Sequence, residues 1–209
     1  MIEQFAKRLS DRILSGLPGI LAHRVMAPTS RQLKNFDEND YPGAKKAAVL
    51  ILFYPEGENV HIVFIKRPSY DGVHSGQVAF PGGKIEEGET PRQAVLRETF
   101  EEIGINETEI NLFGQLSNVY IPPSNFFVFP FLGYALKRPD FIPDLNEVDF
   151  IIESPVEIIL DPSVKGIMEI ERSGETVKAP YYLIQEEKVW GATAIILSEL
   201  EFLLTEPEF

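Results

Sequence analysis

The chain has 209 residues, of which 44% are apolar, and a formal net charge of −13. This length and composition predict one folded domain, residues 1–209, and exclude a disordered or fibrous chain. No apolar run reaches the roughly 20 residues of a membrane span, so we expect no membrane partner. The negative charge disfavours binding to nucleic acid. The absence of cysteine fits a cytoplasmic protein, which is the location that we expect.

Apolar periodicity and turn residues predict the first part of the fold. A helix is expected over residues 2–17 and a polar loop over residues 31–43, which together make an N-terminal extension of about residues 1–43. Strands over residues 47–54 and 60–66 are predicted to pair as a hairpin. A polar, glycine-rich segment over residues 67–79 follows.

The next segment carries the clearest helix signals in the chain. Thr90 is a good N-cap, Gln93 completes a capping box with it, and Pro91 suits the first helical position. Gly104 stands where a left-handed C-terminal cap is expected. These signals predict a helix over residues 91–103.

The remaining residues read as alternating strands, loops and short helices. Ser154 and Glu157 predict a second capping box that opens a short helix ending at Asp161. A stiff loop is expected over residues 120–125 and a closing helix over residues 192–204. Strands are predicted over residues 111–116, 126–136, 148–152, 167–171 and 181–185. Strands interspersed with three or four helices predict a mixed α/β domain whose sheet is covered on both faces.

Three glutamates share one face of the predicted helix over residues 91–103. Glu98, Glu101 and Glu102 are spaced i, i+3 and i+4, and the opposite face carries Leu96, Phe100 and Ile103, which we expect to bury against the sheet. Like charges at this spacing destabilise a bare helix by about 0.2–0.5 kcal/mol per pair. A divalent cation would offset that repulsion, because Mg²⁺ prefers carboxylate oxygens. The alternative is a solvated acidic face.

The same segment resembles the Nudix box, G-x5-E-x7-R-E-U-x-E-E-x-G-U, in which U is a bulky aliphatic residue. Thr99 departs from the pattern at the first U position. The resemblance implies an α/β/α sandwich with a mixed sheet, with the box helix at one sheet edge, and hydrolysis of a nucleoside diphosphate linked to another moiety. The matching residues are Gly83, Glu89, Arg97, Glu98, Glu101, Glu102, Gly104 and Ile105.

Residues upstream of the box resemble the motif of coenzyme A diphosphatases. Arg67, Gly76 and the segment Phe80-Pro81-Gly82-Gly83 match it, as do the segments HSGQ before the box and WGATA before the last helix. Ile65, Pro68 and Gly72 depart from it, and Gly72 replaces a second arginine. The resemblance implies cleavage of coenzyme A or acyl-CoA to 3′,5′-ADP and 4′-phosphopantetheine or its acyl form. The missing arginine keeps ADP-ribose, dinucleotides and oxidised nucleoside triphosphates as alternative substrates.

The box resemblance also implies roles for individual residues. It assigns Glu98, Glu101, Glu102 and the Gly83 carbonyl to a Mg²⁺ or Mn²⁺ ion. Glu98 is the candidate base, and Arg97 is expected to orient a carboxylate such as Glu89.

Further residues are candidates for contact with a small-molecule substrate. Arg67 is the first candidate for binding phosphate, and Lys66, Lys84, His74 and Gly76 are weaker ones. Glu147 and Asp149 are expected to be solvated acids, although either could supply a further carboxylate. Tyr120, Phe126 and Phe127 could stack on a base but are more often core residues. A non-catalytic nucleotide-sensing module is the alternative to an enzyme, and a homodimer is a possible assembly.

Overall fold

The computed structural model describes residues 1–29, 31, 36–72, 74–172 and 174–205. Residues 32–35 of the predicted loop over residues 31–43 therefore lie outside the described residues. The α-helices of the described part are α1 Ile2–Ser15, α2 Ile20–Met26, α3 Pro91–Ile103 and α4 Gly191–Thr205. Short 3-10 helices span Glu38–Asp40, Glu107–Glu109, Val156–Leu160 and Pro162–Val164. None of the helices in these ranges is long and apolar enough to cross a membrane.

The strands form two β-sheets. The larger one contains β1 Lys45–Glu56, β2 Asn59–Lys66, β3 Val78–Ala79, β4 Gly82–Lys84, β5 Asn111–Gln115, β6 Val119–Ile121, β7 Phe126–Tyr134 and β8 Phe150–Pro155. The smaller one contains β9 Lys165–Arg172, β10 Glu175–Ile184 and β11 Glu187–Trp190, in the order β11-β10-β9 and antiparallel throughout.

The larger sheet is mixed, as the sequence predicts. Its main path runs β3-β2-β1-β7-β5, while β4, β6 and β8 pair with β1, β7 and β2 respectively. The central pair β1 and β7 is parallel, with Ala48 opposite Phe129, and β1 and β2 form the predicted antiparallel hairpin. Gly57, with a φ of 60°, makes the turn between them.

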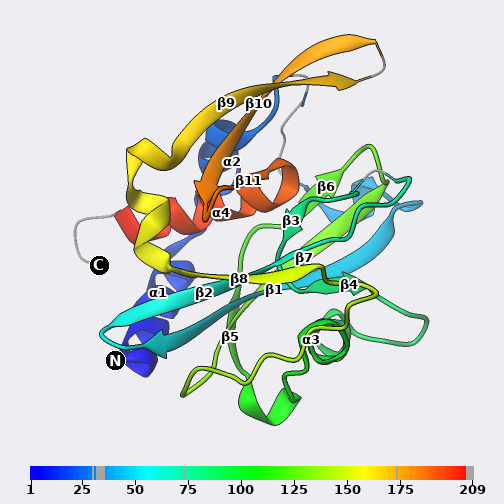
Figure 1. Cartoon of the computed structure of the whole chain (residues 1–209). Helices are drawn as coiled ribbons and strands as arrows, with labels where there is room; N and C mark the ends of the chain where they lie inside the picture. The colour runs from blue at the N-terminus through cyan, green and yellow to red at the C-terminus, as the bar shows by residue number, and fades with distance from the viewer. Residues whose placement is uncertain (30, 32–35, 73, 173, 206–209) are drawn as a thin grey trace.

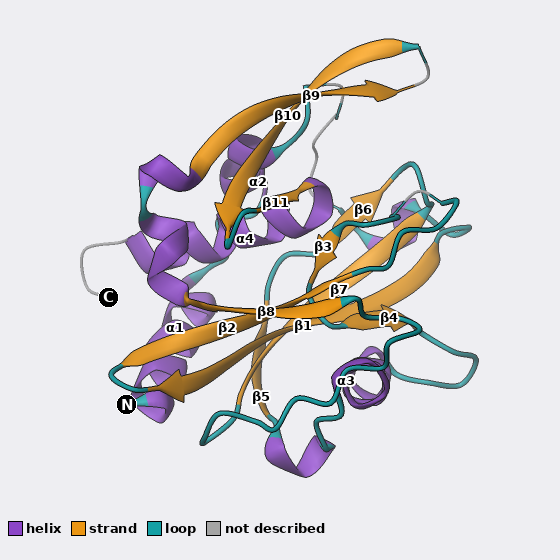
Figure 2. Ribbon diagram, in the orientation of Figure 1, coloured by secondary structure: helices purple, strands orange, loops and turns teal. Residues whose placement is uncertain are grey.

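Helices cover both faces of this sheet (Figures 1 and 2). Helix α3 lies on one face, and α1, α2, α4 and the smaller sheet lie on the other. Alternate residues of β1 serve the two cores, because successive side chains of a strand point to opposite faces. Leu50 and Leu52 pack in the core that contains Val95 of α3, whereas Ile51 and Phe53 pack in the core that contains α1 and α4.

The structure corrects two sequence predictions about local structure. Ser154 does not cap a helix, because β8 continues through Pro155 and pairs Ser154 with Ile62. The helix that follows is a 3-10 helix without a side-chain cap. The loop predicted over residues 120–125 is shorter, since Val119–Ile121 pairs with β7 as strand β6.

Helix α3 also presents a different face to the sheet. Phe100 is 54% exposed, and the buried positions include Val95, Thr99, Glu102 and Ile103. The prediction that Phe100 packs against the sheet is therefore wrong, because one of the three glutamates turns inward. The helix packs both against β1, the middle strand of the main path, and against β4, which among the described strands pairs with β1 alone.

Candidate active site

Helix α3 begins and ends at the residues that the sequence predicts. The Gln93 N–H donates to Thr90 Oγ1 at 3.3 Å, and the Thr90 N–H donates to Gln93 Oε1 at 3.0 Å. At the other end Gly104 adopts a φ of 76°, and its N–H donates to the Phe100 carbonyl at 2.9 Å. Both termini thus have capping hydrogen bonds, which define where the helix begins and ends.

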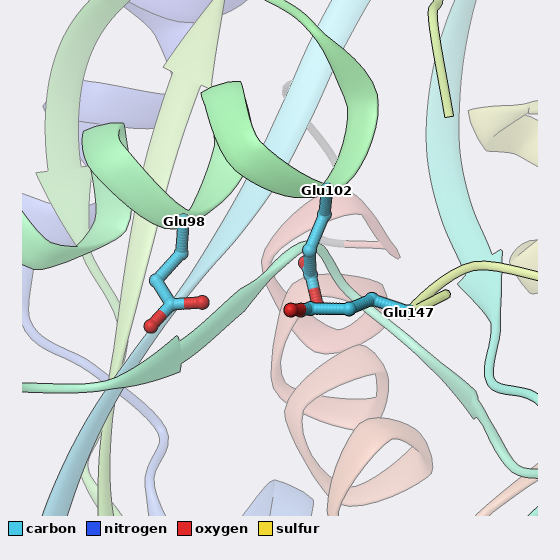
Figure 3. A group of neighbouring side chains, drawn as sticks. All are labelled: Glu98, Glu102 and Glu147. Carbon is cyan, nitrogen blue, oxygen red and sulfur yellow. The ribbon is translucent and has the colours of Figure 1, made fainter. Parts of the chain in front are cut away.

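Three carboxylates converge beside this helix. Glu98 and Glu102 project from α3, and Glu147 reaches toward them from the loop that precedes β8 (Figure 3). One oxygen of each lies within 4.8 Å of the other two. The box pattern predicts Glu98 and Glu102 here together with Glu101, while the sequence favours a solvated role for Glu147 and leaves a ligand role open. The structure brings Glu147, and not Glu101, to the other two glutamates.

Backbone hydrogen bonds hold the Glu147 loop against the end of α3. The Asp144 N–H donates to the Glu102 carbonyl at 3.0 Å, and the Ile142 N–H donates to the Ile103 carbonyl at 2.9 Å. The Glu147 N–H in turn donates to the Asp144 carbonyl at 2.9 Å. These contacts join segments far apart in sequence, so no local pattern around Glu147 could reveal them.

Glu102 is the most deeply buried of the three acids, with 1% of its surface exposed. Its Oε2 accepts the Gly82 N–H at 2.7 Å, and Arg67 Nη2 lies 3.7 Å from its Oε1. Burial raises its pKa to about 8, although Arg67 and the Gly82 N–H act in the opposite direction. Repulsion by the neighbouring Glu98 and Glu147 makes a smaller contribution to that rise. A cation bound here would therefore offset both the cost of burying the Glu102 carboxylate and its repulsion by Glu98 and Glu147.

Arg97 organises the acidic side chains around the helix. It makes a two-fold contact with Glu89, through Nε to Oε1 at 2.9 Å and Nη2 to Oε2 at 3.0 Å, which lowers the pKa of Glu89. Its Nη1 donates to Glu98 Oε1 at 3.0 Å and to Glu101 Oε2 at 2.8 Å. Burial raises the pKa of Glu98 and Arg97 opposes that shift. Glu101 thus faces Arg97, with about half of its side chain exposed.

Strand β4 brings its backbone against the carboxylates. A Cβ added at Gly83 would clash with the Glu98 carboxylate. A Cβ added at Gly82 would overlap the Ala48 carbonyl and lie 2.6 Å from Val49 Cα, and Gly82 also has a φ of 139°. The two glycines therefore let the β4 backbone approach both β1 and the acids, which no other residue type could do.

A cavity of about 1310 Å³ begins at these glycines. Gly82, Gly83 and Lys84 line one part of it together with Arg67, His74 and Gln77. His74 Nδ1 lies 3.1 Å from Gln77 Oε1 within that wall. The rest of the lining includes Tyr120, Ile121, Phe126, Val128, Ile170, Val177, Trp190, Gly191, Ala192, Thr193 and Ile196.

The structure separates the predicted substrate-binding residues. Arg67, His74 and Lys84 line the cavity. Lys66 lies outside that lining, and its Nζ donates to Glu187 Oε2 at 2.6 Å. Gly76 also lies outside it and has a left-handed φ of 62° in the loop, where its N–H donates to the Pro68 carbonyl at 3.1 Å.

The predicted aromatic contacts separate in the same way. Tyr120 and Phe126 line the cavity, and Tyr120 stacks on Tyr41 with ring centroids 4.0 Å apart. Phe127 is a core residue with 1% of its surface exposed. The signals that found Tyr120 could not distinguish it from Phe127, because both are aromatic residues of neighbouring strands.

The donor set fits a hard divalent cation. Three carboxylates offer oxygen ligands within one small volume, and the glycine backbone of β4 lies directly against the Glu98 carboxylate. Mg²⁺ and Mn²⁺ prefer such oxygen ligands, and Mg²⁺ keeps several waters. Glu98, Glu102 and Glu147 are therefore the residues that would hold the ion.

Comparison with known proteins finds one matching family. The model of the NUDIX domain matches residues 44–170, which is more than half of the chain and includes α3 and Glu147. "Nudix hydrolase 3" of Caenorhabditis elegans is 26% identical over 96% of this chain and 86% of its own length. "Mitochondrial coenzyme A diphosphatase NUDT8" of Mus musculus is 31% identical over 78% of this chain and 79% of its own length. The chain spans only 56% to 65% of three further curated relatives.

Solved structures agree with the architecture. A Nudix hydrolase from M. smegmatis, RenU, superposes with a TM-score of 0.54 over 79% of this chain and 89% of its own length. Its sequence identity to this chain is 17%, so the likeness concerns the fold alone.

Proposed function

The chain belongs to the Nudix hydrolase family, and on that premise we propose that it hydrolyses the diphosphate of coenzyme A or acyl-CoA. The proposed products are 3′,5′-ADP and 4′-phosphopantetheine or its acyl form, with Mg²⁺ or Mn²⁺ as cofactor. One observation carries this proposal. A single cavity is lined both by Gly82 and Gly83, which contact Glu102 and Glu98, and by mainly apolar residues, as a diphosphate with a long, weakly polar arm requires.

Two further findings support this substrate. A mouse relative named as a coenzyme A diphosphatase is 31% identical to the chain. Segments that resemble the coenzyme A diphosphatase motif also line the cavity, namely Arg67, His74 and Gln77 before the box and Trp190 with the residues that follow it.

The chain's own groups divide the work of hydrolysis among them. Glu98, Glu102 and Glu147 hold the cation, with the Gly83 carbonyl as a further ligand. When bound, the ion neutralises the diphosphate and acidifies a water. Glu98 accepts the proton of the attacking water at Oε2, because its Oε1 already accepts a hydrogen bond from Arg97. Glu101 acts indirectly, because it holds Arg97, which in turn contacts Glu98.

Arg67 binds a phosphate oxygen at the mouth of the site. Its guanidinium lines the cavity and donates to the Gly82 carbonyl at 3.3 Å, close to the carboxylates. An arginine in this position offers further N–H donors in a planar arrangement that suits phosphate. Gly72 stands where the coenzyme A diphosphatase motif has its second arginine, so Arg67 takes the larger share of phosphate binding in this chain.

A substrate panel tests the proposal. Purified protein with Mg²⁺ is assayed on coenzyme A, ADP-ribose, diadenosine tetraphosphate and 8-oxo-dGTP, and the products are identified by mass spectrometry. We expect the highest kcat/KM on coenzyme A, with 3′,5′-ADP as product. The Glu98→Gln variant serves as control and should lose about 10²–10⁴-fold in kcat, as removal of a general base does. Turnover of ADP-ribose or the dinucleotide with coenzyme A at background would overturn the proposal.

A further inference from the structure

The cavity has two walls of different chemistry. One part of the lining is polar and carries Arg67, His74, Gln77 and Lys84. Another part, the apolar wall, comes from the smaller sheet and helix α4, and its side chains are mostly apolar. They include Ile170 of β9, Val177 of β10, Trp190 of β11 and Ile196 of α4. In Figure 1 the β9–β10 hairpin stands apart from the larger sheet on the side of α4.

Two residues of this apolar wall form a single patch. Ile170 and Val177 are direct partners in the antiparallel ladder between β9 and β10. Side chains of directly opposite residues lie on the same face of a sheet and touch. Both line the cavity, so these two residues present a β-branched, apolar patch to whatever lies there.

Several polar contacts hold the apolar wall in position. Lys66 of β2 binds Glu187 of β11 at 2.6 Å. Tyr182 of β10 donates to Glu201 of α4 at 2.7 Å, and the Thr193 hydroxyl donates to the Val78 carbonyl at 3.0 Å. The wall is therefore built before any ligand arrives, which lowers the entropic cost of binding.

The size and the charge of the cavity narrow the choice of ligand. Its volume of about 1310 Å³ exceeds the roughly 300–1,000 Å³ of pockets for drug-sized ligands. Glu171, next to Ile170, also lines it and accepts the Thr176 hydroxyl at 2.7 Å. A negatively charged arm would meet this carboxylate, whereas a neutral hydrocarbon arm would meet Ile170 and Val177.

We propose that Ile170 and Val177 are specificity-determining residues that select a neutral acyl chain, so that the enzyme prefers medium-chain acyl-CoA to free coenzyme A. This inference rests on the proposed function. Val177, Trp190 and Ile196 lie beyond residues 44–170, the part of the chain that matches the NUDIX domain. The proposed preference thus combines Ile170, the last residue of the matched domain, with residues that follow it.

The test compares kcat/KM along a series of coenzyme A thioesters. Each methylene buried on the apolar wall raises kcat/KM by up to about fourfold, so octanoyl-CoA should exceed free coenzyme A by about tenfold or more. Butyryl-CoA should also exceed succinyl-CoA, which has the same carbon count but ends in a carboxylate. Wild-type protein is measured first, on all four substrates and on ADP-ribose.

Variants of one strand supply the matched comparison. Ile170→Asp should reduce the ratio of kcat/KM on octanoyl-CoA to kcat/KM on coenzyme A to about one, which is a loss of about tenfold. Ile167→Asp places the same change on the same strand at a residue that is 67% exposed and outside the cavity lining, and should leave the ratio at the wild-type value. Ile170→Thr keeps the β-branched shape and replaces Ile170→Asp if the aspartate variant does not fold.

The outcomes separate the two claims. Equal kcat/KM on coenzyme A and octanoyl-CoA, or an Ile170 variant that scales both alike, would overturn the acyl preference and leave the proposed function standing. Wild-type protein that cleaves ADP-ribose but neither coenzyme A nor any of its thioesters would overturn the proposed function and the acyl preference together. A ratio that falls in the Ile170 variant and holds in the Ile167 variant would support both.

Discussion

The Gly82 N–H donates a 2.7 Å hydrogen bond to Oε2 of Glu102, which joins strand β4 to the most buried acid of the site. The bond depends on a backbone position that only glycine can occupy without strain, since Gly82 has a φ of 139°. The adjacent Gly83 lies against Glu98 instead. Two successive glycines thus serve two different acids, and their substitution should have different consequences.

Gly82→Ala should destabilise the protein, whereas Gly83→Ala should chiefly impair catalysis. The alanine at position 82 would meet the backbone of Ala48 and Val49, and the strained φ alone costs about 1–3 kcal/mol. The alanine at position 83 would meet only the end of the Glu98 side chain, which can move aside. Displacing a catalytic group by about 1 Å costs about 100-fold in rate. Urea denaturation and kcat of both variants check this, and the reverse pattern would contradict it.

Glu147→Gln should weaken Mn²⁺ or Mg²⁺ binding more than Glu101→Gln does. Glu147 lies within the group of three carboxylates, whereas Glu101 binds Arg97. Loss of a ligand should lower the affinity for the ion by at least about tenfold. Mutation of residues that only hydrogen-bond to metal ligands already lowers it by about that much. Isothermal titration calorimetry on both variants gives the comparison. A larger loss in Glu101→Gln would favour the ligand set implied by the box pattern.

Arg67→Ala should raise KM for coenzyme A, and Lys66→Ala should act on stability. Arg67 lines the cavity, and a charge-assisted hydrogen bond to phosphate is worth enough for a rise in KM of about tenfold or more. Lys66 instead bridges β2 to β11, and a partly exposed ion pair contributes about 1 kcal/mol or less to the free energy of unfolding. Steady-state kinetics and thermal melts of the two variants decide. Equal changes in KM would assign both residues to the substrate.

Protonation of Glu199 should make the protein less stable in acid. It is fully buried on α4, and it accepts the Ser117 hydroxyl at 2.7 Å and the Gly19 N–H at 2.9 Å, with His23 Nε2 at 3.1 Å. Burial alone would raise its pKa, but the hydrogen bonds from His23 and Ser117 outweigh burial and lower it. The stabilisation is therefore complete above the unfolded pKa of about 4.5 and is lost as the pH falls through the lower, folded-state pKa.

Denaturation at pH 7 and at pH 4 measures the contribution of Glu199. Glu199→Gln should lower the free energy of unfolding at pH 7 by about 1–3 kcal/mol, since buried donors lose a charged acceptor. Its difference in stability between the two pH values should be smaller than that of wild type. The exposed Glu107, changed to Gln, provides the control. An unchanged pH dependence in Glu199→Gln would exclude this residue as the source.

Local signals explain why part of the site could be predicted from sequence. Thr90, Gln93 and Gly104 act within one turn of the α3 termini, so the helix and its phase follow from the chain alone. The inward turn of Glu102 could not be predicted in this way, because its partners Gly82 and Arg67 come from β4 and the end of β2. The sequence predicts Phe100 in the core because this residue lies opposite the three acids on the helix, and the inward turn of Glu102 overturns that prediction.

Tertiary pairing explains the other differences. Serine is a favoured N-cap residue, yet Ser154 lies in strand β8, where it pairs with Ile62, a residue far earlier in the chain. Glu147 reads as one of many acids in a chain of net charge −13. In both cases the decisive neighbour belongs to another element, and short-range patterns carry no information about it.

The hydrogen bond from Asp144 to the Glu102 carbonyl has a consequence for biosynthesis. A nascent chain that has left the ribosome only as far as α3 possesses two of the three acids, and nothing yet holds the third beside them. Tight cation capture therefore waits until the segment around Asp144 has docked on the helix. Ion binding by ribosome-stalled fragments of increasing length would then report the moment at which this part of the domain closes.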